Sequence, residues 1–180
     1  MGTGFCVALP TGVALPQPDR PECRRMRTVT DWLGEYGASH TNPTNKAIHW
    51  LCVPPIVLAV LGLLWSTPVP AAFAAISPWL NWATLAAAAA LTYYFALSPA
   101  LALGVLFAFL ILLVITQQLA TLPWPLWVTS VTIFVIAWVG QFIGHAIEGK
   151  RPSFFKDMQF LLIGPLWLVA AAYRKFSVPY

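Results

Sequence analysis

The chain has 180 residues, of which 59% are hydrophobic and only 9% are charged, and its mean hydropathy is +0.73. These values lie outside the range of soluble domains and indicate that a lipid bilayer is the solvent for most of the chain. The net charge of +4 is carried by short clusters of Lys and Arg and leaves no basic stripe long enough for nucleic acid. Membrane lipids and an acidic lipid substrate are therefore the expected partners.

The first 27 residues differ from the rest of the chain. They are weakly apolar, are interrupted by four prolines and have no basic region ahead of a hydrophobic one, so a signal peptide is not expected. We predict a disordered leader over residues 1 to 27, with Met26 as a candidate natural start. A single membrane domain is expected from residue 28 to 180.

Two helix starts are predicted next. The apolar positions between Val29 and about His40 recur with helical spacing, which predicts a short amphipathic helix at the membrane interface, capped by Thr28 or Thr30. Asn42 and Pro43 then have the residue types of an N-cap and a first helical residue.

Long apolar runs follow and predict an all-α, polytopic membrane helical bundle with four spans. A kink is expected at Pro54 and Pro55 in the first span, because two backbone donors are missing there. The last apolar segment, Phe160 to Tyr173, is shorter and predicts a short C-terminal re-entrant or interfacial helix. The four expected spans are Pro43 to Trp65, Trp79 to Leu97, Ala100 to Leu119 and Trp127 to His145.

Charge and aromatic residues predict the orientation of these spans. All ten Lys and Arg residues precede the first span, begin it or follow the fourth, so the positive-inside rule predicts that both termini are cytoplasmic. An outer aromatic belt is expected at the opposite end, formed by Trp65, Trp79, Trp82, Trp124 and Trp127.

An even number of spans brings the two ends of the uncharged block to the same side of the membrane. His49 begins this block and His145 ends it, while His40 and Glu148 lie close to them in the sequence. Three imidazoles and a carboxylate form a ligand set for non-haem Fe(II), and also for Zn or Mn. The histidines could instead be polar anchors, and Glu148 could belong to a surface ion pair.

Further polar residues near this cluster have two interpretations each. Asn45 and Gln141 lie one turn before a histidine and could orient its imidazole, or could serve as a helix start and a helix-to-helix hydrogen bond. Lys46, Lys150 and Arg151 could bind the carboxylate of an acyl substrate, although positive-inside topology also explains them.

The motif His40-Thr-Asn-Pro-Thr-Asn-Lys-Ala-Ile-His49, with Gln141-Phe-Ile-Gly-His145 and Lys150-Arg-Pro152, resembles the 2-hydroxy fatty acid dioxygenase family. The likeness covers about residues 28 to 175. The family is known best from fungal multipass proteins of the endoplasmic reticulum. The resemblance implies Fe(II)- and O2-dependent α-oxidation, which shortens a long-chain 2-hydroxy fatty acid by one carbon, with iron held by the three histidines.

The sequence departs from the fungal pattern at two positions. Thr41 stands where fungal members have a second histidine, and Glu148 follows His145 by three rather than four residues. Alanine-rich spans and short loops favour a bacterial inner membrane, with the endoplasmic reticulum expected for a eukaryotic source.

Two other functional classes remain open from the sequence. His49 and His145, on two helices, could ligate one haem in a membrane electron carrier. A non-enzymatic lipid-binding or scaffold protein would need none of the histidines. The sequence sets neither the substrate chain length nor the oligomeric state.

Overall fold

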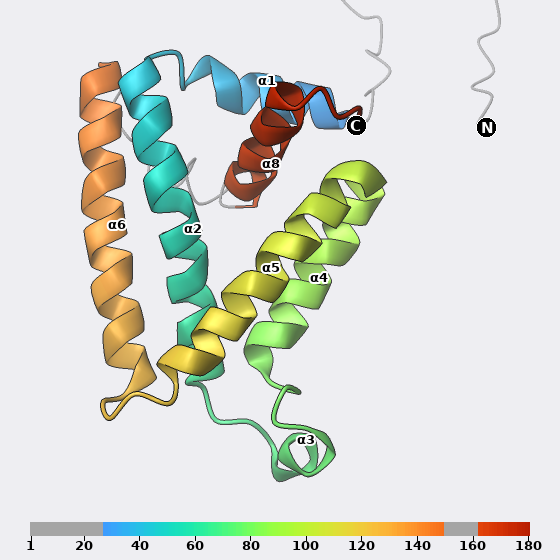
Figure 1. Ribbon diagram of the computed structural model, residues 1–180, viewed down its shortest axis with the longest axis vertical. Coiled ribbons are helices and arrows are strands. Elements are labelled where there is room, and N and C mark those ends of the chain that lie inside the picture. Colours follow the sequence, from blue (N-terminus) through green and yellow to red (C-terminus); the bar gives the residue numbers. More distant parts are fainter. Residues whose placement is uncertain (1–26, 150–161) are drawn as a thin grey trace, which may run out of the picture.

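The computed structural model describes residues 27–149 and 162–180, and all regular secondary structure in these ranges is helical. Helices α2 and α6 lie side by side and antiparallel, and α4 and α5 form a second pair that diverges from them (Figure 1). This arrangement confirms the predicted all-α membrane bundle. The helices are α1 (Val29–Ala38), α2 (Pro43–Trp65), α3 (Ala71–Ile76), α4 (Trp82–Leu97), α5 (Pro99–Leu119), α6 (Leu126–Glu148) and α8 (Ile163–Lys175).

Three of the described helices, α2, α5 and α6, are long and apolar enough to cross a membrane, and α4 is a shorter apolar helix. Helix α4 begins at Trp82 rather than Trp79 because the Asn81 side chain accepts hydrogen bonds from the backbone N–H groups of Ala83 and Thr84. Its 16 residues reach about 24 Å, short of the roughly 30 Å hydrocarbon core.

The predicted starts of α1 and α2 are confirmed. Thr28 and Asp31 form a capping box at α1. The Asn42 side chain accepts from the Thr44 N–H at 2.8 Å, and Pro43 is the first residue of α2. Helix α2 continues through Pro54 and Pro55 to its end. These caps set the direction in which the two helices leave their shared turn.

Helices α2 and α6 approach closely because α6 has glycines one turn apart. A Cβ atom added at Gly140 would lie 2.6 Å from the Cys52 sulfur, and one added at Gly144 would collide with the Asn45 side-chain oxygen. Small residues at this spacing allow the backbones of membrane helices to pack together. The contact places the first turns of α2 beside the last turns of α6.

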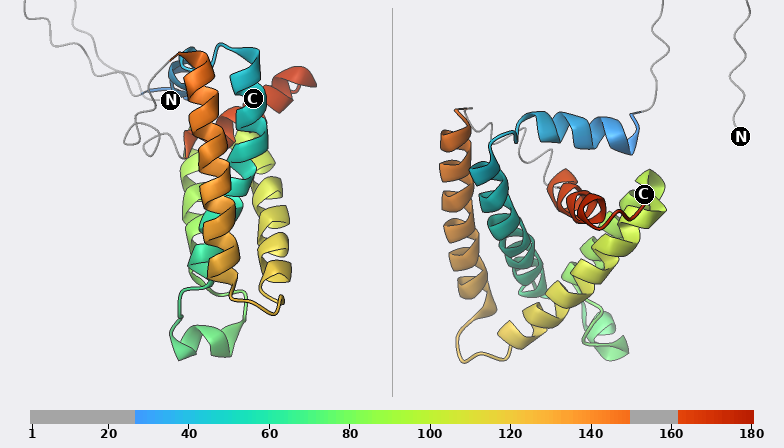
Figure 2. Two further views of the ribbon diagram at one scale, coloured as in Figure 1. Left: turned by 90° about the vertical axis from the view of Figure 1, so that its left-hand side faces the viewer. Right: turned by 45° about the horizontal axis from the view of Figure 1, so that its top comes forward.

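Helix α8 is the predicted short C-terminal helix, and it packs against α1, α2 and α5, with α1 lying across the same end of the bundle (Figures 1 and 2). Its buried face includes Leu166 and Trp167. The Tyr94 hydroxyl of α4 donates to the Leu162 carbonyl at 2.6 Å, and the Tyr173 hydroxyl donates to the Ala100 carbonyl at 3.1 Å. Both ends of α8 are thus fixed to the α4–α5 pair.

The bundle has two chemically different ends. The start of α2, the end of α6, α1 and the end of α8 lie at one end, as the two further views also show (Figure 2). At the other end, the Trp65 and Trp79 rings are in contact, with centroids 5.4 Å apart, and the Trp82, Trp124 and Trp127 side chains are exposed. The described Lys and Arg residues and the five tryptophans of the predicted belt, which were used to predict the orientation, therefore lie at opposite ends of the bundle.

Substitution of a glycine in the α2–α6 contact should destabilise the fold. We expect Gly144→Ala to cost about 1–3 kcal/mol, because the new methyl group meets Asn45. Gly34→Ala is the control, since nothing lies within 4 Å of a Cβ at that exposed helical position; it should be neutral or slightly stabilising. Thermal unfolding in detergent compares the two variants, and equal stability would contradict the contact.

Candidate metal centre

Three buried histidines meet at one end of the bundle. His40 follows α1, His49 lies in the second turn of α2 and His145 lies in the last turn of α6. They are 3%, 2% and 7% exposed, and one ring nitrogen of each lies within 4.8 Å of those of the other two. His145 is more than ninety residues from His40 and His49 in the sequence, yet the three side chains offer one set of donor atoms that fits a metal ion.

The hydrogen bonds of two histidines fix their tautomers. His40 Nδ1 lies 2.7 Å from the Tyr36 carbonyl oxygen, and His49 Nδ1 lies 2.9 Å from the Asn45 carbonyl oxygen. Because a carbonyl oxygen only accepts, each Nδ1 carries the ring hydrogen and donates it. In the neutral rings, both Nε2 atoms then carry lone pairs.

These two Nε2 atoms are 2.9 Å apart. Two lone pairs cannot form a hydrogen bond with each other, so the contact is unfavourable unless a cation is shared between them. A metal ligand histidine that donates its other ring N–H to a backbone carbonyl is the usual arrangement in metalloproteins. The donor set therefore fits a metal ion, with His145 as a third ligand.

Glu148 ties the end of α6 to the turn between α1 and α2. One carboxylate oxygen accepts from the Thr41 N–H at 2.8 Å and from the Thr41 hydroxyl. The other accepts from the Asn42 N–H at 3.0 Å and from the Asn45 side-chain amide at 3.0 Å. The carboxylate is not in the group of converging donor atoms, which among the described residues holds only the histidines.

The two polar residues predicted to orient imidazoles have different surroundings. The Asn45 backbone carbonyl, not its side chain, accepts from His49. The Asn45 Oδ1 and Gln141 Oε1 atoms are buried and have no hydrogen-bond partner in the described part of the chain. The role of Gln141 toward His145 stays a prediction.

The predicted substrate clamp is only partly within the described residues. Lys46 is exposed on the first turn of α2, at the same end as the histidines. Lys150 and Arg151 lie outside the described residues, as do residues 1–26 of the predicted leader, including Met26. A role for these three cations in substrate binding stays a prediction.

Two aromatic residues lie against His40: Tyr36, which the sequence places beside the cluster as an interface anchor, and Trp167, which the sequence did not indicate. The Tyr36 ring stacks on His40 with ring centroids 4.3 Å apart. The ring centroid of Trp167, in α8, lies 5.7 Å from that of His40. Tyr36 precedes His40 by four residues, and this helical spacing could have indicated the contact. No sequence spacing relates Trp167 to the histidines, because the packing of α8 brings it there.

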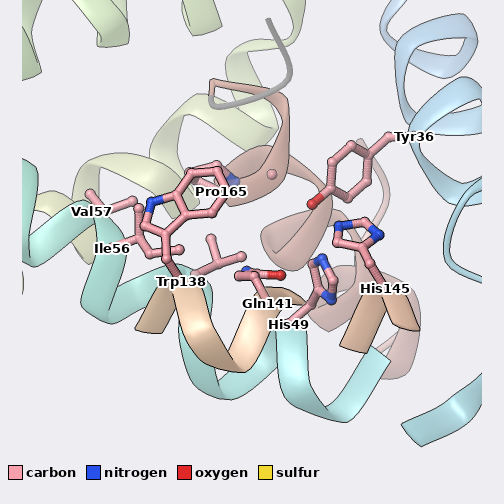
Figure 3. Close-up of a pocket in the computed structure, with 10 residues that line it drawn as sticks. Tyr36, His49, Ile56, Val57, Trp138, Gln141, His145 and Pro165 are labelled. Atoms are coloured by element: carbon pink, nitrogen blue, oxygen red, sulfur yellow. The ribbon is translucent and has the colours of Figure 1, made fainter. Parts of the chain in front are cut away.

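A cavity of about 50 Å³ opens beside the histidines (Figure 3). His49, Gln141 and His145 form part of its wall, and apolar residues form most of the remainder. Val57 and Pro165 also line two neighbouring apolar cavities of about 110 and 210 Å³. The candidate metal centre is thus next to hydrophobic space between the helices.

The fold and the site define a helical membrane protein with a candidate metal centre at one end of its bundle. The model of one family, described as "2-hydroxy-palmitic acid dioxygenase Mpo1-like", matches residues 26–176. The chain belongs to this Mpo1-like family. No curated protein and no solved structure shows significant similarity to the chain.

Loss of one histidine should abolish metal binding. We expect the purified protein to bind about one Co²⁺ ion per chain, with a visible spectrum that is absent in His49→Ala, because the remaining nitrogens leave the ion under-coordinated. Gln118→Ala, an exposed polar position on α5, is the control. Unchanged Co²⁺ binding by His49→Ala would contradict a histidine metal centre.

Removal of the Glu148 charge should weaken metal binding without abolishing it. We expect Glu148→Gln to lower metal affinity about 10- to 100-fold, as measured by competition with a chelator, because the turn that carries His40 and Asn45 loses its anchor. Thr41→Val removes one hydroxyl donor to the same carboxylate and should give a smaller loss. Wild-type affinity in both variants would rule out this anchoring role.

Proposed function

We propose that the protein is an Fe(II)-dependent dioxygenase that acts on long-chain 2-hydroxy fatty acids. The observation that carries this proposal is the facing pair of Nε2 atoms, 2.9 Å apart, in a chain of the Mpo1-like family. His40, His49 and His145 would hold the iron. When bound, Fe(II) with open coordination positions would supply the binding and activation of O2 beside the substrate. In this proposal, Glu148 positions the ligands through Thr41 and Asn42.

The remaining residues would bind and orient the acid. Its carboxylate end would lie at the histidines, with Lys46 as a cation at the same end of the bundle. Its tail would lie among the apolar side chains that line the cavities, such as Val57 and Pro165. Holding both reactants beside one centre lowers the entropic part of the barrier, and apolar walls keep water away.

The proposed reaction balances without a further reductant. The bond between C1 and C2 breaks, C2 becomes the carboxyl carbon of an acid one carbon shorter, and C1 leaves as CO2. This is a four-electron oxidation of the substrate, which matches the four-electron reduction of O2, and one molecule of water is formed. Formate in place of CO2 would require two additional electrons.

We also propose an orientation, in which the histidine end faces the cytoplasm. The described cations Arg27, Lys46, Arg174 and Lys175 belong to that end, and the five tryptophans of the predicted belt belong to the other. Both termini would then be cytoplasmic. A bacterial inner membrane is our proposed location.

The geometry disfavours the haem alternative. A rigid porphyrin ring must fit as one piece between its two histidine ligands, whereas the cavity beside His49 and His145 holds about 50 Å³ and neither histidine lines the neighbouring larger cavities. A third histidine also lies against His49, where a porphyrin ring would have to pass. The scaffold alternative differs in another way, since it requires no function of the histidines.

The activity assay uses 2-hydroxypalmitate and ¹⁸O2 with purified, iron-loaded protein. We expect an acid one carbon shorter that contains ¹⁸O, together with CO2 from C1. His40→Ala should reduce the rate to background, because the centre loses a ligand, while Gln118→Ala should retain it. Absence of the shorter acid with iron bound would reject the substrate, and wild-type activity in His40→Ala would reject the site.

A further inference from the structure

None of the described residues donates a hydrogen bond to the side-chain oxygen of Gln141. Gln141 is 6% exposed and lines the same cavity as His49 and His145 (Figure 3). Its Oε1 atom is buried and makes no hydrogen bond to any residue that the structure describes. Buried polar atoms in proteins are almost always paired, so an unpaired acceptor at a cavity indicates a donor that the ligand brings.

The position of this acceptor restricts where the donor lies on the ligand. Gln141 is one helical turn before His145 on the same face of α6. In Figure 3 its amide lies between Trp138 and His49. A ligand whose polar group is held at the histidines would therefore need its donor close to that group, not far along its chain.

The other residues that line the cavity indicate the chemistry of the rest of the ligand. Val53, Ile56, Val57 and Pro165 line the cavity around Gln141. Val53, Val57 and Pro165 also line the apolar cavity of about 210 Å³ between α2, α5 and α8. A molecule that fits both cavities has one polar end with a donor and a long apolar tail.

We propose that Gln141 Oε1 accepts a hydrogen bond from the 2-hydroxyl group of the fatty acid and selects hydroxylated over unhydroxylated acids. This inference rests on the proposed function, because it places the carboxylate at the histidines. The 2-hydroxyl is bonded to the carbon next to the carboxylate, so it is the donor nearest to that end. Palmitate has no such donor and would leave Gln141 Oε1 buried and unpaired. Gln141 is thus a specificity-determining residue.

The test measures binding of 2-hydroxypalmitate and palmitate without turnover, in metal-free protein and in protein loaded with redox-inert Zn²⁺. We expect the wild type to prefer the hydroxy acid about tenfold or more, and Gln141→Met, which has similar length but no strong acceptor, to reduce this preference about tenfold. Palmitate affinity should stay near the wild-type value. Ile56→Val, an apolar change in the same cavity, should leave the preference unchanged.

Two results would overturn the inference. One is no preference in the wild type, or a preference that Gln141→Met retains. The other is loss of palmitate binding in both Gln141→Met and Gln141→Leu, which would make Gln141 a packing residue. Failure of the proposed function has a different signature, namely no oxidation of 2-hydroxypalmitate by iron-loaded protein, whereas the binding preference is measured without iron or turnover.

Discussion

The contact between His40 and His49 constrains the histidine end of the structure. Their Nδ1 atoms donate to backbone carbonyls, so their Nε2 lone pairs face each other at 2.9 Å. A proton or a metal ion between the two nitrogens makes such a contact favourable, and backbone carbonyls hold both rings in place. One carbonyl, that of Tyr36, belongs to the end of α1, and the other, that of Asn45, belongs to the start of α2. The turn between these helices therefore sets the geometry of the candidate metal centre.

The third histidine depends on how α6 is held against that turn. Gly144 permits the close approach of the helices, and Glu148 adds hydrogen bonds to Thr41, Asn42 and Asn45. Glu148 is half-buried, and both of its carboxylate oxygens accept hydrogen bonds there. The same contacts that satisfy the charge also align the last turn of α6. The hydrogen bonds of Glu148 thus contribute both to the stability of the α2–α6 contact and to the position of His145.

Local signals in the sequence predicted the helices well, and tertiary packing accounts for what they missed. The caps at Thr28 and Asn42 were readable because capping depends on neighbouring residues only. The start of α4 was also readable, since Asn81 and Thr84 form a capping box, but hydropathy extended the predicted span beyond it. The contact of Trp167 with His40 was not, because it depends on where α8 packs.

The candidate site was predictable to the extent that topology determines it. The predicted even number of crossings placed the two ends of the uncharged block on one side, and the structure brings all three histidines together there. The short distance in sequence between His145 and Glu148 suggested a fourth ligand, whereas the Glu148 oxygens bind the turn between α1 and α2. The N–H groups of Thr41 and Asn42 and the Thr41 hydroxyl bind the carboxylate there, and their positions depend on how α2 packs on α6.

Helices α4 and α5 contribute no side chain to the histidine cluster, yet α5 provides one wall of the apolar cavity of about 210 Å³. The α4–α5 pair thus lines hydrophobic space without contributing to the histidine cluster, whereas α2 does both. Mutations in the α4–α5 hairpin can reshape the hydrophobic compartment while the coordinating groups stay in place. Relatives that differ in this hairpin could therefore admit apolar molecules of different length or branching while the histidine cluster stays the same.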